Sequence, residues 1–381
     1  MTNKKLNSVI YFYCNFPQYA RNNIFLNGLK QNHIKVHDFN LKRARVFNTN
    51  VESIFFFFKN LRNLISLDSE LIVIYSHAPI HFILAKILAI IKRVPLVNDI
   101  FFSKLETKVY DRNLYNKPKL PRILYKAYYF MMDKLECNLS DYIILDTMSH
   151  IKFFHEKFNI PLRKYRKILV GAQDNFFIPR EKIKKVSDTF VVGFWGSSVP
   201  LHGISYMIKS AKLLEKYKDI KFIMIGDGQT YEEDRELAKS LDLKNIKFIP
   251  GNFVVENRIE ELVELLTEFD IGLGIFGTSS KAQIVIPNKL YEGVAMKIPM
   301  INSNTPAIRE EFTEDHDIIL CNRADPNSIA EAILRLKDNP NLRKEIMDNG
   351  YELFKQKFSI EKIGKSLVQT LNNILIFKEN K

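Results

Sequence analysis

Short apolar runs alternate with helical patterns along the whole chain, and this alternation limits the fold more than any other feature of the sequence. The strand-like runs include VIYFY, LIVIYSH and DYIILDT in the first half, and FVVGFWG and IKFIMIGDG in the second. Strands that alternate with helices form βαβ units and parallel sheets. A polar, basic stretch at 163–188 interrupts the pattern, which then restarts. We therefore predict an α/β protein made of two doubly wound units.

The length of the chain agrees with two units. It has 381 residues, whereas single hydrophobic cores stop growing at about 250–300 residues. We predict Rossmann-like domains at 1–180 and 181–360, with a linker near 178–189. Ligands bind such folds at the carboxyl ends of the strands and between domains, so we expect the two domains to face each other across a cleft. We expect 361–381 to be a C-terminal helix, for which a return to the first domain is one alternative.

Positive charge is concentrated in the first half. Residues 1–180 carry 28 Lys and Arg against 13 Asp and Glu, whereas residues 181–381 carry 28 against 30. Such asymmetry indicates that the first half faces an anionic partner. Basic aromatic helices at 55–65 and 122–134 favour a peripheral contact with anionic lipid headgroups. Ordinary core helices with solvated lysines are the alternative.

No segment of the sequence has the pattern of a membrane span or a signal peptide. The longest apolar stretch, 79–94, contains His81, Lys86, Lys92 and Arg93, and about 20 apolar residues are needed to cross a bilayer. The apolar run at 9–14 is shorter than the roughly 7–15 residues of a signal peptide core. The three cysteines lie far apart in sequence, which fits a reducing compartment. We expect a cytoplasmic protein, with the inner face of the membrane as an alternative location.

Glycines follow several strands of the second half. Gly196, Gly226 with Gly228, and Gly251 each come directly after or close to an apolar run. Glycine lets the backbone approach a ligand, and amides at helix starts suit a diphosphate. Turn geometry alone is the alternative explanation.

The segment 277–301, GTSSKAQIVIPNKLYEGVAMKIPMI, is the most informative part of the sequence. A polar loop with Lys281 leads to a helix for which Asn288 is a plausible N-cap. Lys289 lies in the first turn, where a cation is unfavourable unless an anion is nearby. Glu292 follows on the Asn288 face, where a carboxylate can accept hydrogen bonds from a ribose diol. A solvated surface glutamate is the alternative.

This segment resembles the donor site of retaining GT-B glycosyltransferases of family 4. The motif is KLYEGVAMKIPMI at 289–301, and the resemblance covers nearly the whole chain. It implies transfer of a sugar from a nucleotide diphosphate sugar to a hydroxyl, with retention and without a metal or cofactor, in the synthesis of cell-surface glycans. It also implies that Glu292 binds the ribose and that the amides of Asn288, Lys289 and Leu290 hold the phosphates. The turn with Gly196, Ser197, Ser198 and Gly226 would begin the donor site.

Two departures from the family pattern change the expected diphosphate site. The first glutamate of the family's pair falls at Ile284, and its usual basic pair falls at Ser197 and His202. We infer that His202 replaces a lysine as a hydrogen-bond donor, with Lys281 supplying the missing charge. A hydrogen bond at the helix entry is the alternative role of His202.

Polar residues at strand ends of the first half are the candidates for the acceptor side. Asp99 and His202 are the predicted catalytic residues, and Asp99 is the one expected to touch the acceptor or the transferring sugar. The other candidates are Arg21, Asn22, Ser76, His77, Asp146 and Thr147. His150 is more typical of a structural histidine, and no His or Asp cluster has the spacing of a metal site.

Three other classes of protein remain as alternatives. A UDP-sugar 2-epimerase shares this architecture but needs cleft carboxylates that the sequence does not identify. An inactive glycan- or nucleotide-binding scaffold is kept open by the changes at Ile284 and Ser197. A nucleic-acid-binding protein is disfavoured, because the lysines are spread over several elements without a known motif.

Overall fold

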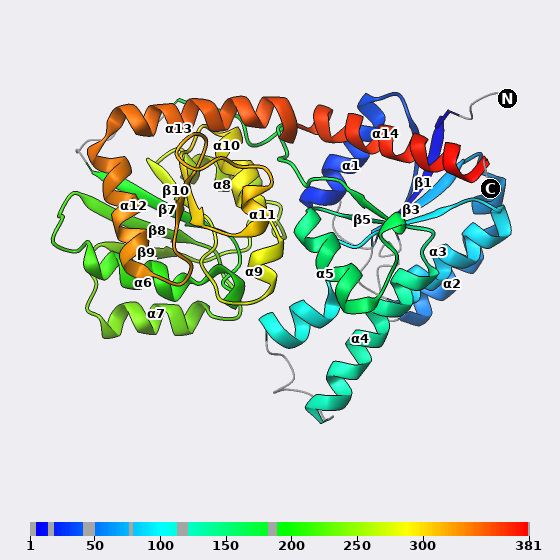
Figure 1. Cartoon of the computed structure of the whole chain (residues 1–381), viewed down its shortest axis with the longest axis horizontal. Helices are drawn as coiled ribbons and strands as arrows, with labels where there is room; N and C mark the ends of the chain where they lie inside the picture. Colours follow the sequence, from blue (N-terminus) through cyan, green and yellow to red (C-terminus); the bar gives the residue numbers. More distant parts are fainter. Residues whose placement is uncertain are drawn as a thin grey trace. The chain divides into compact units, whose positions relative to one another are not determined.

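The computed structural model describes residues 5–13, 19–40, 50–75, 79–112, 121–181 and 189–379 (Figure 1). The chain divides into two compact units. The first comprises Met1–Val109, Leu114–Val170 and Ile360–Lys381, and the second comprises Tyr110–Asn113 and Gly171–Ser359. The predicted linker lies largely outside the described residues, since 182–188 are among those not described.

The first unit is built on a parallel six-stranded sheet with the order β2-β1-β3-β4-β5-β6. Its strands are β1 (Ser8–Tyr13), β2 (Lys35–Asn40), β3 (Leu71–Tyr75), β4 (Leu96–Asp99), β5 (Tyr142–Leu145) and β6 (Tyr165–Lys167). All residues of β1 and β3 are buried. Such continuous apolar runs are typical of parallel strands covered on both faces.

Helices cover both faces of this sheet. They are α1 (Ala20–Gln31), α2 (Asn50–Ser66), α3 (Pro79–Lys92), α4 (Arg122–Leu139), α5 (Met148–Phe158) and α14 (Ile360–Glu379), with shorter turns at Glu106–Asp111 and Leu162–Lys164. Val73 and Tyr75 pack in the same cluster as α1 and α14, whereas Ile72 and Ile74 pack with α2 and α3. Because successive side chains of a strand point to opposite faces, α1 and α14 cover one face and α2 and α3 the other.

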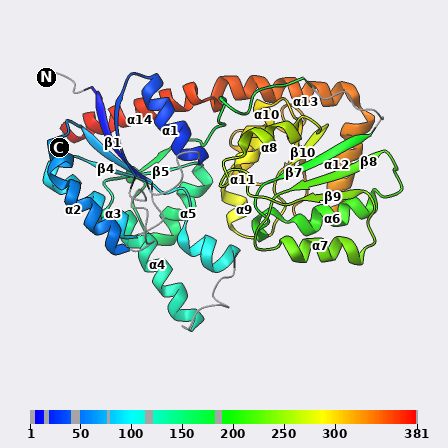
Figure 2. The ribbon, with the colours of Figure 1, turned by 180° about the vertical axis from the view of Figure 1, so that it is seen from behind.

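The C-terminal helix α14 packs on α1, and both views show the two helices side by side (Figures 1 and 2). The contact is made at two glycines. A Cβ on Gly364 would lie 2.6 Å from the Cα of Gly28, and a Cβ on Gly28 would lie 2.7 Å from the Cα of Gly364. The backbones therefore touch, and α14 contributes Ile363, Leu367 and Leu371 to the core of the first unit.

The second unit has a parallel six-stranded sheet with the order β12-β11-β10-β7-β8-β9. Its strands are β7 (Phe190–Trp195), β8 (Ile220–Ile225), β9 (Ile246–Ile249), β10 (Ile271–Leu273), β11 (Met300–Ser303) and β12 (Ile319–Cys321). The chain adds β8 and β9 on one side of β7 and then returns to add β10 on the other. The strand order thus reverses between β7 and β10, the position where doubly wound sheets bind ligands.

Helices again follow the strands. They are α6 (Ile204–Leu213), α7 (Tyr231–Ser240), α8 (Ile259–Leu266), α9 (Lys281–Ile284), α10 (Asn288–Ala295), α11 (Pro306–Arg309), α12 (Pro326–Asp338) and α13 (Pro340–Leu353), with one-turn segments at Pro200–His202 and Phe354–Phe358. The two doubly wound α/β units confirm the predicted fold class. In the described part of the chain, no helix combines the length and apolarity needed to cross a bilayer.

Candidate functional site

Two glycine turns cross at the carboxyl ends of β7 and β8. Gly196 and Gly226 have φ angles of 128° and 145°, a region that side chains rarely adopt. A Cβ on Gly226 would lie 1.9 Å from the carbonyl oxygen of Gly196, and one on Gly228 would lie 2.6 Å from that of Ser198. The turns therefore need glycine to approach each other.

The amides of these turns are used within the fold. Gly196 N–H donates to the carbonyl of Ile225 at 3.0 Å, and Ser198 N–H donates to that of Asp227 at 2.9 Å. Gly226 N–H likewise donates to Ile249 at 2.9 Å. The glycines thus shape the turns. The amides of Gly196 and Gly226 are bonded within the fold, whereas the sequence had predicted that they bind a ligand.

The loop after β10 is fixed to the turn that begins α6. The amide of Phe276 donates to the carbonyl of His202 at 3.0 Å, and that of Gly277 donates to Leu201 at 3.2 Å. A Cβ on Gly277 would lie 2.3 Å from the carbonyl oxygen of Pro200, so the two backbones are in contact. This pairing holds the beginning of α9, and with it Lys281, beside the turn that contains His202.

Lys289 is the most unusual side chain of the second unit. It is 4% exposed, and its Nζ has no hydrogen-bond partner within the described structure. The Nζ of Lys289 lies 3.7 Å from the centroid of the Phe194 ring. A Cβ on Gly196 would lie 3.5 Å from the same Nζ. Burial holds the pKa of Lys289 well below its ordinary value, against a smaller opposite effect of Glu292. An unpaired buried amine beside a glycine turn is a ready site for an anion.

Glu292 lies one turn further along α10 and is half-buried. Its Oε2 accepts a hydrogen bond from the indole Nε1 of Trp195 at 2.6 Å. Burial raises the pKa of Glu292 to about 7, while Trp195 and Lys289 act in the opposite direction. The carboxyl is therefore held in one orientation by the last residue of β7, at the same place as Lys289.

His202 also lies beside Gly196, since a Cβ on Gly196 would lie 3.7 Å from its Cε1. Its Nδ1 is hydrogen-bonded to the carbonyl of Ser197, so Nδ1 carries the proton. Burial and the charge of Lys289 lower the pKa of His202 well below its ordinary value. The neutral ring then presents Nε2 as an acceptor. The expected role as a hydrogen-bond donor to an anion requires that Nε2 first take up a proton.

The start of α10 differs from the expectation in one detail. Pro287 occupies the N-cap, and Asn288 is the first helical residue rather than the cap. The amide of Leu290 donates to the carbonyl of Pro287 at 3.0 Å. The amides of Asn288 and Lys289 belong to the first turn, in which helical N–H groups have no partner one turn earlier.

Lys281 begins α9, and its charge acts on both His202 and Asp111. Asp111 belongs to the second unit. Burial raises the pKa of Asp111, and Lys281 opposes this more strongly than Arg112 does. The structure thus brings His202, Lys281, Lys289 and Glu292 to the same edge of the second sheet.

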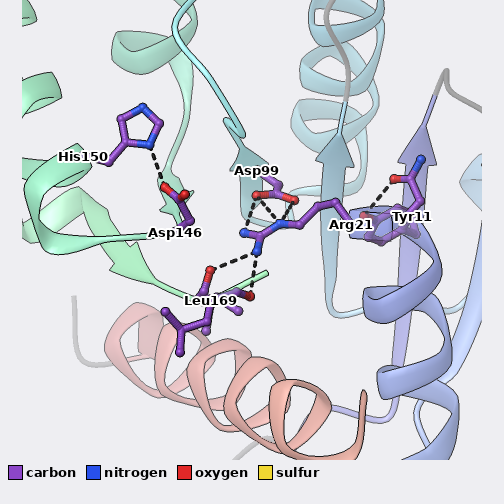
Figure 3. Close-up of polar contacts among 8 residues, drawn as sticks. Tyr11, Arg21, Asp99, Asp146, His150 and Leu169 are labelled. Carbon is purple, nitrogen blue, oxygen red and sulfur yellow. Dashed lines mark hydrogen bonds and ion pairs between the residues drawn. The ribbon is translucent and has the colours of Figure 1, made fainter. Parts of the chain in front are cut away.

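The acceptor-side candidates of the first unit lie in a buried network (Figure 3). Both carboxylate oxygens of Asp99 accept hydrogen bonds from Arg21, at 2.8 Å and 2.9 Å, and both side chains are 0% exposed. Arg21 also donates to the carbonyls of Ile168 and Leu169. Asp99, which the sequence singled out as the catalytic residue, is thus fully engaged inside the first unit.

Other candidates of the first unit are also buried. His150 and Asp146 are hydrogen-bonded at 2.7 Å (Figure 3). Thr147 caps α5 by accepting a hydrogen bond from the amide of His150. Ser76 and His77 lie outside the described residues. No cluster of three or more metal-ligand side chains occurs in the ranges that the structure describes.

Comparison with solved structures shows the class of fold. The chain superposes over 96% of its length on 99% of Anabaena HepE crystallised with UDP-glucose, with a TM-score of 0.69 and 15% identity. It superposes over 97% of its length on 99% of a sucrose-phosphate synthase from Thermosynechococcus elongatus, with a TM-score of 0.72 and 12% identity. The chain has the GT-B fold.

Sequence comparison then places the second unit more narrowly. Residues 176–353 match the family model described as "Glycosyl transferases group 1". The chain is similar to uncharacterized glycosyltransferase MJ1178 of Methanocaldococcus jannaschii, with 31% identity over 44% of each protein. It is also similar to the capsular polysaccharide biosynthesis glycosyltransferase CapM of Staphylococcus aureus, with 25% identity over 55% of this chain and 52% of CapM. The match spans about half the length of these relatives.

Two aromatic residues of this site were not identified from the sequence. Phe194 covers the Nζ of Lys289, and Trp195 donates to Glu292. They are the last two residues of β7, and the sequence pattern indicates only that they belong to the hydrophobic core around a buried strand. The one available signal is that Trp195 is the only tryptophan of the chain and directly precedes a glycine turn.

Proposed function

We propose that this chain transfers a sugar from a nucleotide diphosphate sugar to a hydroxyl acceptor, with retention and without a metal ion. The observation that carries the proposal is the buried, unpartnered Nζ of Lys289 next to Gly196 and Glu292, within the residues that match the group 1 glycosyl transferase model. An amine in this position has a large desolvation cost that a bound anion offsets. The UDP in complexes of the structurally similar HepE supports a nucleotide donor.

Each side chain then has one role. Glu292 accepts hydrogen bonds from the ribose hydroxyls, with its orientation fixed by Trp195. Lys289 lies under the diphosphate and becomes an ammonium when the diphosphate is bound, because a nearby anion favours the charged form. His202 takes up a proton on Nε2 for the same reason and donates this proton to a phosphate oxygen in a hydrogen bond. Its Nδ1–H keeps its hydrogen bond to the carbonyl of Ser197.

The chemistry requires charge stabilisation above all. The glycosidic bond to the diphosphate breaks, the sugar becomes cationic and the diphosphate leaves with the bonding electrons. Lys289, His202 and the charge of Lys281 stabilise the developing anion from fixed positions. A phosphate oxygen of the leaving group accepts the proton of the acceptor hydroxyl, so no protein nucleophile is required.

We place the reaction in the synthesis of a cell-surface glycan at the cytoplasmic side of the membrane. The names of two relatives support this role, because CapM acts in capsular polysaccharide biosynthesis and LpsD of Rhizobium meliloti in lipopolysaccharide core biosynthesis. A polysaccharide, a glycolipid and a lipid-linked oligosaccharide are all hydroxyl acceptors of this kind.

A donor screen tests the proposal. The full chain is incubated with UDP- and GDP-sugars and simple acceptor glycosides, with and without EDTA, and the anomeric configuration of the product is read by NMR. We expect an α-linked product from an α-linked donor, at a rate that EDTA does not change. Loss of activity in EDTA contradicts metal independence, and nucleotide binding without transfer to any acceptor favours an inactive scaffold. Epimerisation of the donor without an acceptor overturns the proposal.

A further inference from the structure

Large apolar side chains are exposed mainly on three neighbouring helices of the first unit. Among the described residues, 18 large hydrophobic side chains are exposed, and 12 of them lie on α2, α3 and α4. Helix α3 packs against both α2 and α4, and the three helices follow one another on the sheet (Figures 1 and 2). The 12 side chains are Phe55, Phe58, Ile65, Ile83, Ile90, Ile91, Ile123, Leu124, Tyr128, Met131, Leu135 and Leu139.

The exposed residues of α4 form a stripe rather than scattered points. Leu124, Tyr128, Met131 and Leu135 are separated by four, three and four residues, the spacing of one helical face. These side chains are 53%, 52%, 55% and 43% exposed, respectively. Contiguous exposed apolar surface of this kind marks an interaction site in a soluble domain.

The opposite face of α4 already has its partners. Asp133 and Glu136 are buried. The Oε2 of Glu136 accepts from the Nζ of Lys104 at 2.6 Å, and Asp133 accepts from Ser103 at 2.6 Å. The acidic side of this helix is therefore occupied inside the first unit, and the apolar stripe is the side that a partner outside the unit can contact.

The charges on these helices select the partner. Helices α2, α3 and α4 carry seven basic residues and three acidic ones, and two of the acids are the buried Asp133 and Glu136. On α2, Lys59 and Arg62 are exposed between Phe58 and Ile65. Apolar and aromatic side chains interspersed with cations match an interface of acyl chains and anionic headgroups.

We propose that α2, α3 and α4 form a docking surface for an anionic phospholipid bilayer. The aromatic and aliphatic side chains of the three helices enter the boundary between headgroups and acyl chains, and the exposed Lys59 and Arg62 of α2 contact the headgroup phosphates. Mixed chemistry favours a bilayer over a second copy of the chain, because a second copy would bring the same positive charge to the contact. The inference concerns the first unit and does not depend on the donor site.

Vesicle co-sedimentation with the whole chain of 381 residues tests this surface. Vesicles of phosphatidylglycerol and phosphatidylcholine are compared with pure phosphatidylcholine, at low and high salt. We expect binding to the anionic vesicles at low salt, with weaker binding as salt rises. Absence of binding to anionic vesicles at low salt overturns the proposal.

Paired variants identify the surface. The double change Lys59→Gln with Arg62→Gln lowers the partition coefficient onto anionic vesicles about 25-fold. This is the product of a loss of about fivefold for each charge near an anionic surface. Replacing Leu124→Ser together with Met131→Ser weakens binding while the salt dependence remains. All four residues are exposed, so the melting temperature stays within a few degrees of the parent.

A control pair on the second unit keeps the test specific. Leu213 and Val255 are 44% and 50% exposed and lie outside the proposed surface. Leu213→Ser with Val255→Ser leaves vesicle binding unchanged, and equal losses in both apolar pairs contradict the proposal. A concentration-dependent dimer that the Leu124 and Met131 changes abolish, without vesicle binding, assigns the surface to a second copy instead and overturns it as well.

Discussion

Lys289 holds its amine in a position that costs stability in the unliganded protein. A buried polar group without a partner costs about 1–3 kcal/mol, and the Nζ of Lys289 has no partner in the described structure. We predict that Lys289→Met raises the free energy of unfolding by about this amount, because methionine fills the same space without a polar group. The same change weakens binding of UDP or GDP at least tenfold, since the anion loses its buried cation. Thermal unfolding and calorimetric titration measure the two effects.

A conservative variant separates this role from simple packing. Lys289→Arg keeps the charge but adds bulk beside Phe194 and Gly196, so it lowers stability and retains part of the nucleotide affinity. If Lys289→Met binds UDP and GDP as tightly as the parent, the diphosphate lies elsewhere.

Glu292 gives the site a dependence on pH. Its pKa of about 7 lies above the ordinary value of 4.5, so the folded protein binds more protons than the unfolded chain between these values. Stability therefore falls as pH rises from about 4.5 to 7. We predict that Glu292→Gln removes this dependence, so that the variant gains up to about 3 kcal/mol over the parent at pH 8 and much less at pH 5. Urea denaturation at the two pH values measures the difference, and an equal gain at both contradicts the raised pKa.

Asp99 gives the clearest distinction between a structural and a catalytic role. Breaking a buried ion pair by removing one charge costs about 3–5 kcal/mol, and the Arg21–Asp99 pair is fully buried. We predict that Asp99→Asn lowers stability by this amount while kcat, measured at a temperature where the variant is folded, stays within about threefold of the parent. The double change Arg21→Met with Asp99→Leu recovers most of the stability. A kcat that falls a hundredfold with unchanged stability restores Asp99 as a group that touches the acceptor.

The sequence could predict which residues of the second unit are polar and near a helix start, but not how their protonation is set. The position of Glu292 on α10 follows from helical spacing. Burial raises its pKa and the hydrogen bond from Trp195, which is 97 residues away in sequence, opposes the rise. The pKa of Lys289 likewise depends on burial. The same holds for Asp99, because its ion pair with Arg21 joins residues 78 positions apart. Periodicity gives no signal for such pairings.

At the scale of elements, long periodic segments were predictable, whereas short ones were predictable only in part. The pattern of FVVGFWG corresponds to β7, and that of NKLYEGVAM to α10. The three-residue strand β6 and the four-residue helix α9 were missed. Segments this short contain hardly more than one period of apolar residues, so tertiary hydrogen bonds decide their conformation.

The contact of α1 with α14 supplies a prediction for a pair of elements. A Cβ on Gly364 meets the backbone of Gly28 at 2.6 Å, which a side-chain rotation cannot relieve. We predict that Gly364→Ala lowers the free energy of unfolding by about 1–3 kcal/mol, because the helices must separate. Ser366→Ala, at an exposed position of the same helix, serves as the matched control and changes stability by less than about 0.5 kcal/mol. Chemical denaturation compares the two, and equal effects refute the close contact.

At the scale of the whole molecule, the two units have separate hydrophobic cores. One cluster of the second unit contains residues from Phe190 to Ile346 only, whereas three clusters of the first unit draw on β1 to β6 and on α14. The uneven charge follows the same division, since the excess of basic residues lies in the first 180 positions. The charge asymmetry could be predicted from the sequence, because the net charge of a segment is the sum of the charges of its residues. The participation of α14 in the first core depends on the Gly28–Gly364 contact between segments more than 300 residues apart.

Separate cores predict that a nucleotide protects only one of the two units from hydrogen exchange. A ligand stabilises the state that binds it, by about 2.7 kcal/mol at a hundred times its dissociation constant, and openings confined to the other core do not involve that state. With excess UDP or GDP, we expect slower exchange in peptides that cover 195–203 and 287–293, and unchanged exchange in those that cover β1 and β5. Lys289→Met provides the control, because it removes the protection and keeps the fold. Protection that centres on β1 and β5 instead would assign the nucleotide to the first unit and reverse the roles of the two halves.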